Sequence, residues 1–179
     1  MTVELGHFAL VLAFSLALVQ FAVPLAGTRF GDLKLTAIAG PAAMMCFLFT
    51  LLSFFALTAA YVQSDFSVAN VWENSHSAKP MLFKVTGVWG NHEGSMLLWV
   101  LILTFFGALV AWFSGNLPTT LRSNVLSVQG LVAAAFLLFI LMTSNPFIRM
   151  NPAPMEGRDL NPILQDVGLA IHPPLLYLG

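Results

Sequence analysis

A cluster of polar and aromatic residues lies directly before a long apolar segment. The sequence GVWGNHEGSMLLW, residues 87–99, places Trp89, Asn91, His92 and Glu93 within one short stretch. An imidazole can carry a proton or bind a metal, and an indole ring suits a membrane interface or the edge of a ligand. The free N–H groups and positive dipole end of the following helix favour an anion such as Glu93. We therefore take this stretch as a candidate site at one rim of a membrane.

The spacing of this cluster does not fit a zinc protease. That motif needs a second histidine four positions after the first, and Met96 stands there instead. His92 is therefore predicted to be a structural residue of the rim, hydrogen-bonded within its loop. Trp89 and Trp99 are predicted to be interfacial anchors, with a role for Trp89 in stacking on a ligand as the alternative.

Another histidine stands before two prolines. In DLNPILQDVGLAIHPPLLYLG, residues 159–179, Asn161 is a predicted N-cap, and apolar residues follow at helical spacing. We expect a short amphipathic helix on the membrane surface that stops at His172, because a residue before proline favours extended backbone. Pro173 and Pro174 would open a further helix that the sequence begins and does not complete, as in the front part of a longer protein.

Composition places these residues in an integral membrane protein. Hydrophobic residues make up 58% of the 179 residues and charged residues 8%, and the mean hydropathy is +0.85. The formal net charge of −1, without clustered basic residues, indicates no nucleic-acid partner. The single cysteine, Cys46, lies in an apolar run, so the sequence has no CxxC pair and no CxxCH haem-attachment motif.

Four segments are long and apolar enough to cross about 30 Å of hydrocarbon. They cover residues 5–23, 38–62, 96–113 and 127–143. The predicted fold is all-α: a polytopic membrane protein with four complete transmembrane helices, the start of a fifth and a short periplasmic amphipathic helix.

The loop charges favour a periplasmic N-terminus. Arg29, Lys34 and Arg122 fall in the two predicted inner loops, where basic residues are denser than in the outer segments. The outer loops would then be residues 63–95 and 144–173, and all four histidines would lie at or near the outer face. The first of these loops is too long to be a simple connector.

Two blocks of the sequence, NSHSAKPMLFKVTGVWGNHEGSMLLW and DLNPILQDVGLAIHPPLLYLG, closely resemble the CcmF haem-lyase family of bacterial cytochrome c maturation, whose near relative serves nitrite-reductase cytochromes. The resemblance covers the chain from end to end. It implies an inner-membrane protein that takes haem b from a periplasmic haem chaperone and joins its vinyl groups to the CxxCH thiols of apocytochrome c. The implied partners also include a thioreduction subunit, the remaining membrane segments of the haem lyase and the lipid bilayer.

The resemblance places His172 at the family's first periplasmic haem-ligating histidine. A rim imidazole suits an axial ligand of haem iron, and a helix-capping histidine is the alternative. Its second ring nitrogen would need an acceptor, for which Glu93, Glu73 and Asp166 are candidates. The family's second periplasmic histidine and its transmembrane histidines would lie beyond Gly179.

For the first cluster, the resemblance adds a further interpretation. Trp89, Asn91, His92 and Glu93 would form a docking surface for haem or for the haem chaperone, beside the structural roles given above. The sequence does not choose between the main family and its nitrite-reductase relative, nor does it name the apocytochromes or the number of haems.

Two other functions stay open. A non-catalytic scaffold subunit of the maturation complex would have the same membrane segments and the same partners. An ion-coupled transporter subunit would need ionisable residues inside the spans. After Glu4 and His7, the four predicted spans contain none, which disfavours the transporter.

Overall fold

The computed structural model describes residues 1–179, and nearly all of its regular structure is helical. Its elements are α1 (Thr2–Phe30), α2 (Leu33–Ala37), α3 (Ala39–Gln63), α4 (Ala69–Asn74), α5 (Met81–Gly87), α6 (His92–Phe113), α7 (Thr119–Thr143), the 3-10 helix η1 (Pro162–Gln165) and α8 (Val167–Leu178). Four helical stretches are long and apolar enough to span a membrane: α1, α2 with α3, α6, and α7. The all-α fold class and the four complete spans are therefore confirmed.

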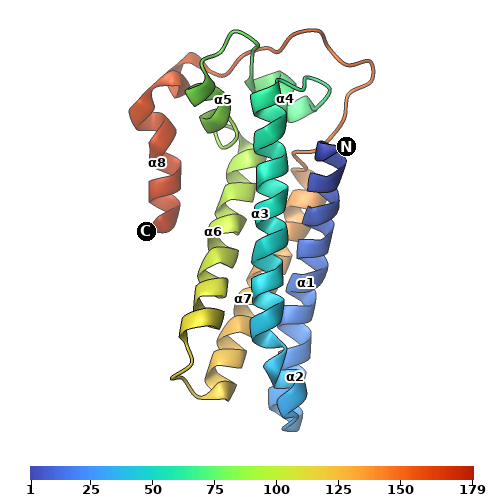
Figure 1. Ribbon diagram of the computed structural model, residues 1–179, viewed down its shortest axis with the longest axis vertical. Helices are drawn as coiled ribbons and strands as arrows, with labels where there is room; N and C mark the ends of the chain where they lie inside the picture. Colours follow the sequence, from blue (N-terminus) through green and yellow to red (C-terminus); the bar gives the residue numbers. More distant parts are fainter.

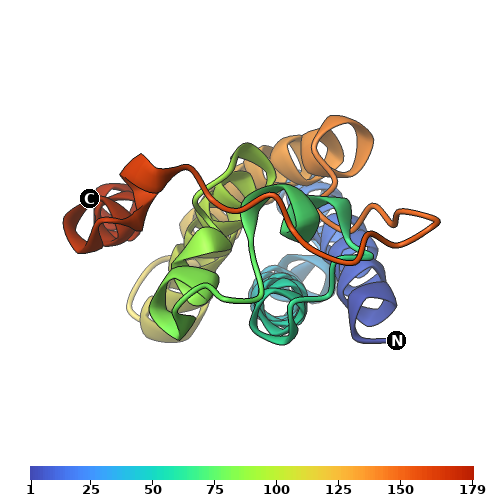
Figure 2. The ribbon, with the colours of Figure 1, turned by 90° about the horizontal axis from the view of Figure 1, so that it is seen from above.

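The four long helices form a bundle (Figure 1). Helix α1 contacts α3 and α7, and α6 contacts the same two helices from the other side. One end of the bundle carries α4, α5 and the segment 144–166, which cross over the helix ends (Figure 2). We call this the capped end, and the opposite end, with α2 and the α6–α7 turn, the open end.

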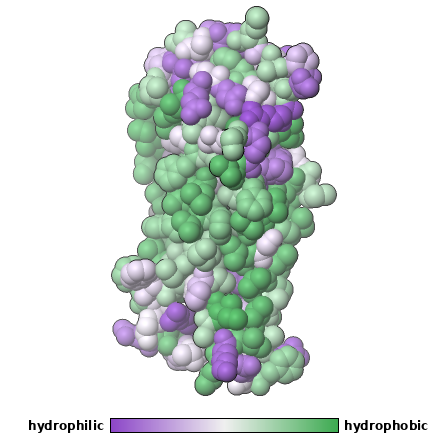
Figure 3. Space-filling model, turned by 45° about the vertical axis from the view of Figure 1, so that its right-hand side comes forward, coloured by the Kyte–Doolittle hydropathy of each residue, from purple (hydrophilic) through white to green (hydrophobic).

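Small residues let the helices approach closely. Ala13 and Ala17 on α1 are fully buried, and Ala133 and Ala134 on α7 are almost fully buried. Packing of this kind is how helices associate in a bilayer, where lipid already solvates larger apolar side chains. On the face drawn in Figure 3, hydrophobic side chains cover the middle of the bundle, and hydrophilic ones gather at its two ends.

The first predicted inner loop, residues 24–37 between the first two spans, is wrong in extent. Most of these residues are helical. Pro24 lies inside α1, which continues to Phe30 and ends at Gly31, whose φ of 71° suits glycine. Asp32 then caps α2 by accepting the Lys34 N–H at 2.8 Å. The absence of a side chain at Gly27 lets the α2 backbone pack directly on α1.

Helices α6 and α7 also begin earlier than their apolar stretches suggest. Helix α6 starts at His92 instead of Met96, because Asn91 provides a side-chain cap. Helix α7 starts at Thr119 instead of Ser127, directly after Pro118. The predicted spans covered only the apolar part of each helix. The Asn91 cap sets the start of α6, and Pro118, which has no side-chain cap to offer, directly precedes the start of α7.

At the capped end, Arg149 ties three segments together. Its Nε donates to Glu4 Oε1 at 2.9 Å, and its Nη1 donates to Asp65 Oδ2 at 2.9 Å. The backbone of Arg149 also forms an isolated antiparallel bridge with Val68. The predicted outer loop 63–95 is therefore an ordered layer, held to the start of α1 by charged groups.

Candidate functional site

A hollow of about 330 Å³ lies at the capped end, between the start of α6 and α8. Trp89, Asn91 and His92 line one side of it, and Ala170 and Tyr177 of α8 line the other. The structure therefore brings three of the four residues of the first predicted cluster to one cavity. Glu93, the fourth, does not line this hollow and points to a different set of partners.

Asn91 fixes the start of α6. Its Oδ1 accepts the Gly94 N–H at 2.8 Å, and Glu93 lies in the first turn, as the predicted helix dipole favours. A Cβ at Gly94 would overlap the Val88 carbonyl oxygen, so no other residue fits there without a backbone shift. The glycine is thus required by close packing and not by an unusual backbone angle.

Behind Asn91 lies a buried polar network that sequence reasoning missed. Tyr61, fully buried near the end of α3, donates its hydroxyl to Asn70 Oδ1 at 2.6 Å. Asn91 Nδ2 donates to Tyr61 Oη at 3.0 Å. Asn70 Nδ2 donates to Asn91 Oδ1 at 2.8 Å and to Glu93 Oε2 at 3.2 Å. The network locks α3, α4 and α6 together, because each buried polar atom finds its partner on another element.

Trp89, in the turn between α5 and α6, connects α3 to α8. Its ring stacks on Phe54 with the centroids 6.4 Å apart, and its Nε1 donates to the Ala170 carbonyl oxygen at 2.8 Å. In an uninterrupted helix that carbonyl would accept the N–H of residue 174, but Pro174 has none. The indole therefore satisfies a carbonyl that the proline leaves free.

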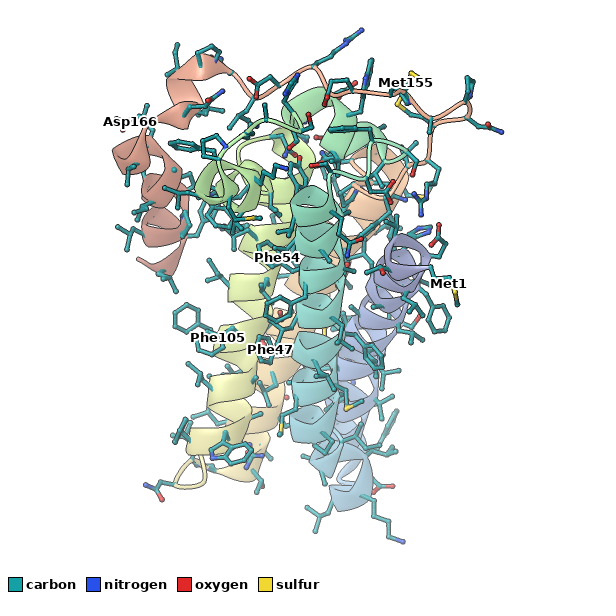
Figure 4. The ribbon with its side chains drawn as sticks, turned by 45° about the horizontal axis from the view of Figure 1, so that its top comes forward. Met1, Phe47, Phe54, Phe105, Met155 and Asp166 are labelled. Carbon is teal, nitrogen blue, oxygen red and sulfur yellow. The ribbon has the colours of Figure 1, made fainter.

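The predicted helix end at His172 is wrong. Asn161 caps η1 as expected, but Asp166 then caps a separate helix, α8, which runs through His172 and both prolines to Leu178. The chain stays helical because two missing N–H groups leave only two carbonyls free, and Trp89 takes one of them. Helix α8 runs alongside the bundle in both ribbon views, and not flat across its end (Figures 1 and 2). Asp166 marks its start, across the molecule from Met1 (Figure 4).

His172 lies on the face of α8 that points away from the rest of the chain. It is exposed, it forms no hydrogen bond, and it does not line the hollow. Ile171, Leu175 and Leu176 are exposed on the same side of the helix. The structure therefore separates His172 from the Trp89 cluster. None of the three carboxylates considered as acceptors for its ring bonds to it.

His92 bonds to another helix and not within its loop. Its Nε2 lies 3.1 Å from the Ser144 hydroxyl, and its ring meets Phe139 edge-on with the centroids 6.4 Å apart. This contact joins the start of α6 to the end of α7. The structural role predicted for His92 fits these contacts, although the partner lies 52 positions away in sequence.

Residues 156–160 form a strap across the segment before α5. The Glu156 carboxylate accepts the Ser77 N–H at 3.0 Å and the Ser77 hydroxyl at 2.6 Å. These two hydrogen bonds and one from the Gly157 N–H lower the pKa of Glu156 to about 2. His76 Nε2 lies 4.0 Å from the same carboxylate.

The strap continues with two more cross-links. The Arg158 guanidinium lies 4.1 Å from the centre of the Trp72 ring, and the buried Lys79 ammonium lies 3.3 Å from Asp159 Oδ1. Burial and the neighbouring Lys84 charge lower the pKa of Lys79 more than Asp159 raises it. Leu160 follows directly and lines the hollow, so the strap sets the edge of the site.

Comparison with known proteins places this arrangement in a family. A family model described as "Cytochrome C assembly protein" matches residues 89–179. Cytochrome c-type biogenesis protein CycK of Rhizobium meliloti is 65% identical over 179 residues, covering 100% of this chain and 26% of that protein. Cytochrome c-type biogenesis protein CcmF of Pseudomonas aeruginosa is 52% identical over 177 residues, covering 98% of this chain and 27% of that protein.

A solved structure agrees with the sequence comparisons. "Cytochrome c Heme Lyase CcmF" superposes with a TM-score of 0.82 at 25% sequence identity, over 99% of this chain and 28% of that one. The chain spans about a quarter of the length of the relatives that it matches. The four membrane-spanning segments and these matches show that the chain belongs to the cytochrome c assembly protein family.

Proposed function

We propose that this chain is the N-terminal, haem-binding part of a bacterial cytochrome c haem lyase, in which His172 is an axial ligand of haem b iron. The observation that carries the proposal is the state of His172. Its imidazole is exposed, free of hydrogen bonds and fixed on a helix that Trp89 anchors to the bundle. Family membership and the solved haem-lyase structure support the same function.

The residues around His172 fit a haem. A porphyrin presents broad apolar faces, and the exposed side chains next to His172, namely Ile171, Leu175 and Leu176, are apolar. Iron coordination needs a neutral imidazole nitrogen, and no protein hydrogen bond occupies either ring nitrogen of His172. When bound, haem supplies the iron and the vinyl groups that are joined to CxxCH thiols of apocytochrome c.

The protein's own contribution in this proposal is to hold the ligand in place. The bond from Trp89 to Ala170 fixes the rotation of α8, and Asp166 fixes its start by accepting the Leu169 N–H at 3.1 Å. Trp89, Asn91, His92 and Glu93 therefore act chiefly by positioning α8 and α6. The exposed rim at His92 is where we place docking of a haem chaperone.

The chain is a multi-pass membrane protein of the cytochrome c biogenesis family. We further propose that it lies in the bacterial inner membrane with its N-terminus and capped end in the periplasm. Its partners there would be the haem chaperone, apocytochrome c, a thioreduction subunit and the remaining segments of the haem lyase. The opposite axial ligand and the thiols would come from outside this chain.

Measuring holocytochrome c in cells that assemble the complete system tests this proposal. His172→Ala should abolish maturation while the protein stays in the membrane, as immunoblotting of membranes would record. His7→Ala is the matched control, since His7 is also exposed at the capped end and bonds only to Asn145. Normal holocytochrome yield with His172→Ala would reject the ligand assignment and leave a scaffold role for α8.

A further inference from the structure

A second hollow, of about 360 Å³, lies at the open end of the bundle, between α2, the start of α3 and the start of α7. Arg122 of α7 lines it and is half-buried there. The missing side chain at Gly40 makes room for the guanidinium, since a Cβ at Gly40 would lie 2.9 Å from Arg122 Nη2. The proposed haem site is at the other end of the bundle.

Two donors in this hollow have no partner in the chain. Ser123 is only 2% exposed, lines the hollow, and its hydroxyl forms no hydrogen bond. Arg122 takes part in none of the five ion pairs, which lie at the capped end. Asp32, the acidic residue at the open end, uses its carboxylate to cap α2. A buried hydroxyl and a guanidinium without acceptors fit an anion that brings several oxygen atoms.

The start of α7 adds further donors at the same place. The helix has 25 residues, begins at Thr119 and has no side-chain cap, so its first N–H groups and its positive dipole end are free. Thr119 also lines the hollow. A helix start beside an arginine is a common arrangement for binding a phosphate group.

An apolar groove of about 400 Å³ begins next to this hollow, between α3 and α6. Met44 and Leu48 line it from α3, and Met44 lies one helical turn beyond Gly40. Trp112 lines it from α6 and is highly exposed. Phe47 and Phe105, labelled in Figure 4, meet across the two helices with their ring centroids 5.6 Å apart. All nine lining residues are hydrophobic, which suits an acyl chain in a bilayer.

We propose that the open end binds one phospholipid, with its phosphodiester at Arg122, Ser123 and the start of α7, and an acyl chain in the α3–α6 groove. Charge complementarity favours this occupant. The open end carries the exposed cations Arg29 and Lys34 in addition to Arg122, and all three lie where the ends of membrane-spanning helices meet lipid headgroups. A free phosphate would use the donors but would leave the groove without a ligand.

Binding of defined lipids to the purified full protein in detergent tests the proposal. Native mass spectrometry would compare phosphatidylglycerol with diacylglycerol of the same acyl chains, and phosphatidylglycerol should bind more tightly. Arg122→Gln should weaken phosphatidylglycerol binding about fivefold, the contribution of one basic residue near an anionic membrane surface. Arg29→Gln removes a charge at the same end that does not line the hollow, so it should weaken phosphatidylglycerol binding less than Arg122→Gln does.

Three results would overturn the proposal. Equal phosphatidylglycerol binding by wild type and Arg122→Gln would remove the headgroup site. Equal binding of diacylglycerol and phosphatidylglycerol would leave only non-specific acyl contact, and displacement of the lipid by an equal concentration of inorganic phosphate would indicate a free-phosphate site. If Arg122→Gln fails to fold, Ser123→Ala provides a second test of the headgroup site. It should weaken phosphatidylglycerol binding and leave diacylglycerol binding as it is.

Discussion

Trp89 couples two helices through a single indole N–H. The bond to Ala170 compensates for the backbone donor that Pro174 lacks, so one side chain both completes α8 and holds it against the turn before α6. The indole, predicted from sequence to be an interfacial anchor, thus supports the helix that carries the proposed ligand. In the proposed function, haem ligation by His172 would depend on Trp89, 83 positions away in sequence, although Trp89 itself does not reach His172.

Replacing Trp89 by Phe should loosen α8 without disrupting the bundle. The ring can still stack on Phe54, but the hydrogen bond to Ala170 is lost, at a cost of about 0.5–1.5 kcal/mol. Hydrogen–deuterium exchange should rise in residues 167–178. Trp99→Phe is the control, because Trp99 packs on Phe136 and donates no hydrogen bond. Equal exchange of α8 in both variants would show that the indole N–H does not hold the helix.

Glu156 should make the strap sensitive to acid. Its pKa is about 2 in the folded protein, against 4.5 for an ordinary glutamate. Because the folded value is the lower one, its stabilising contribution is complete above pH 4.5 and is lost as the pH falls towards 2. Exchange protection of residues 156–160, corrected for intrinsic rates, should fall over this interval.

Two variants separate Glu156 from other acids. Glu156→Gln should reduce the pH-dependent loss of protection, whereas Glu73→Gln should leave it unchanged, since Glu73 is exposed and forms no hydrogen bond or ion pair. Identical pH profiles for wild type and Glu156→Gln would contradict the role given to the Ser77 contacts.

At the scale of elements, the start of α6 is the tightest junction in the site. Gly94→Ala should destabilise the fold by about 1–3 kcal/mol, because the added methyl group would overlap the Val88 carbonyl and force the backbone to move. Gly115→Ala offers a matched control, since open space surrounds Gly115. Thermal unfolding in detergent, followed by circular dichroism, should show a lower Tm for Gly94→Ala alone. A Tm equal to that of the control would mean that α6 can start elsewhere.

The elements predicted correctly from sequence depend on local patterns. Apolar length identified the four spans, and Asn161 was recognised as a cap because capping involves only the next few residues. The predicted helix end at His172 is wrong because Pro174 leaves the Ala170 carbonyl without a backbone donor, and the replacement donor, Trp89, lies on a distant segment. Tyr61 and Asn70 were missed for the same reason, since neither belongs to a motif and both bond across elements.

For the whole molecule, membrane orientation is the property on which the other assignments depend. Loop charges predict that Ser75 lies in the periplasm and Thr119 in the cytoplasm. Fusions at Ser75 should be active with a periplasmic reporter, and fusions at Thr119 with a cytoplasmic one. The capped end, with α4, α5 and the strap, would then face the compartment where apocytochrome c is found. The reverse pattern of activities would invert the topology and remove His172 from that compartment.

The absorption spectrum of haem in the assembled complex tests the central claim most directly. His172→Gly should change or abolish the spectrum of the haem held at the capped end, because it removes the imidazole while the rest of α8 keeps its contacts with the bundle. Adding imidazole to this variant should restore the wild-type spectrum, which a purely structural role of His172 would not produce. If the His172→Gly spectrum matches that of wild type before imidazole is added, His172 does not ligate haem iron.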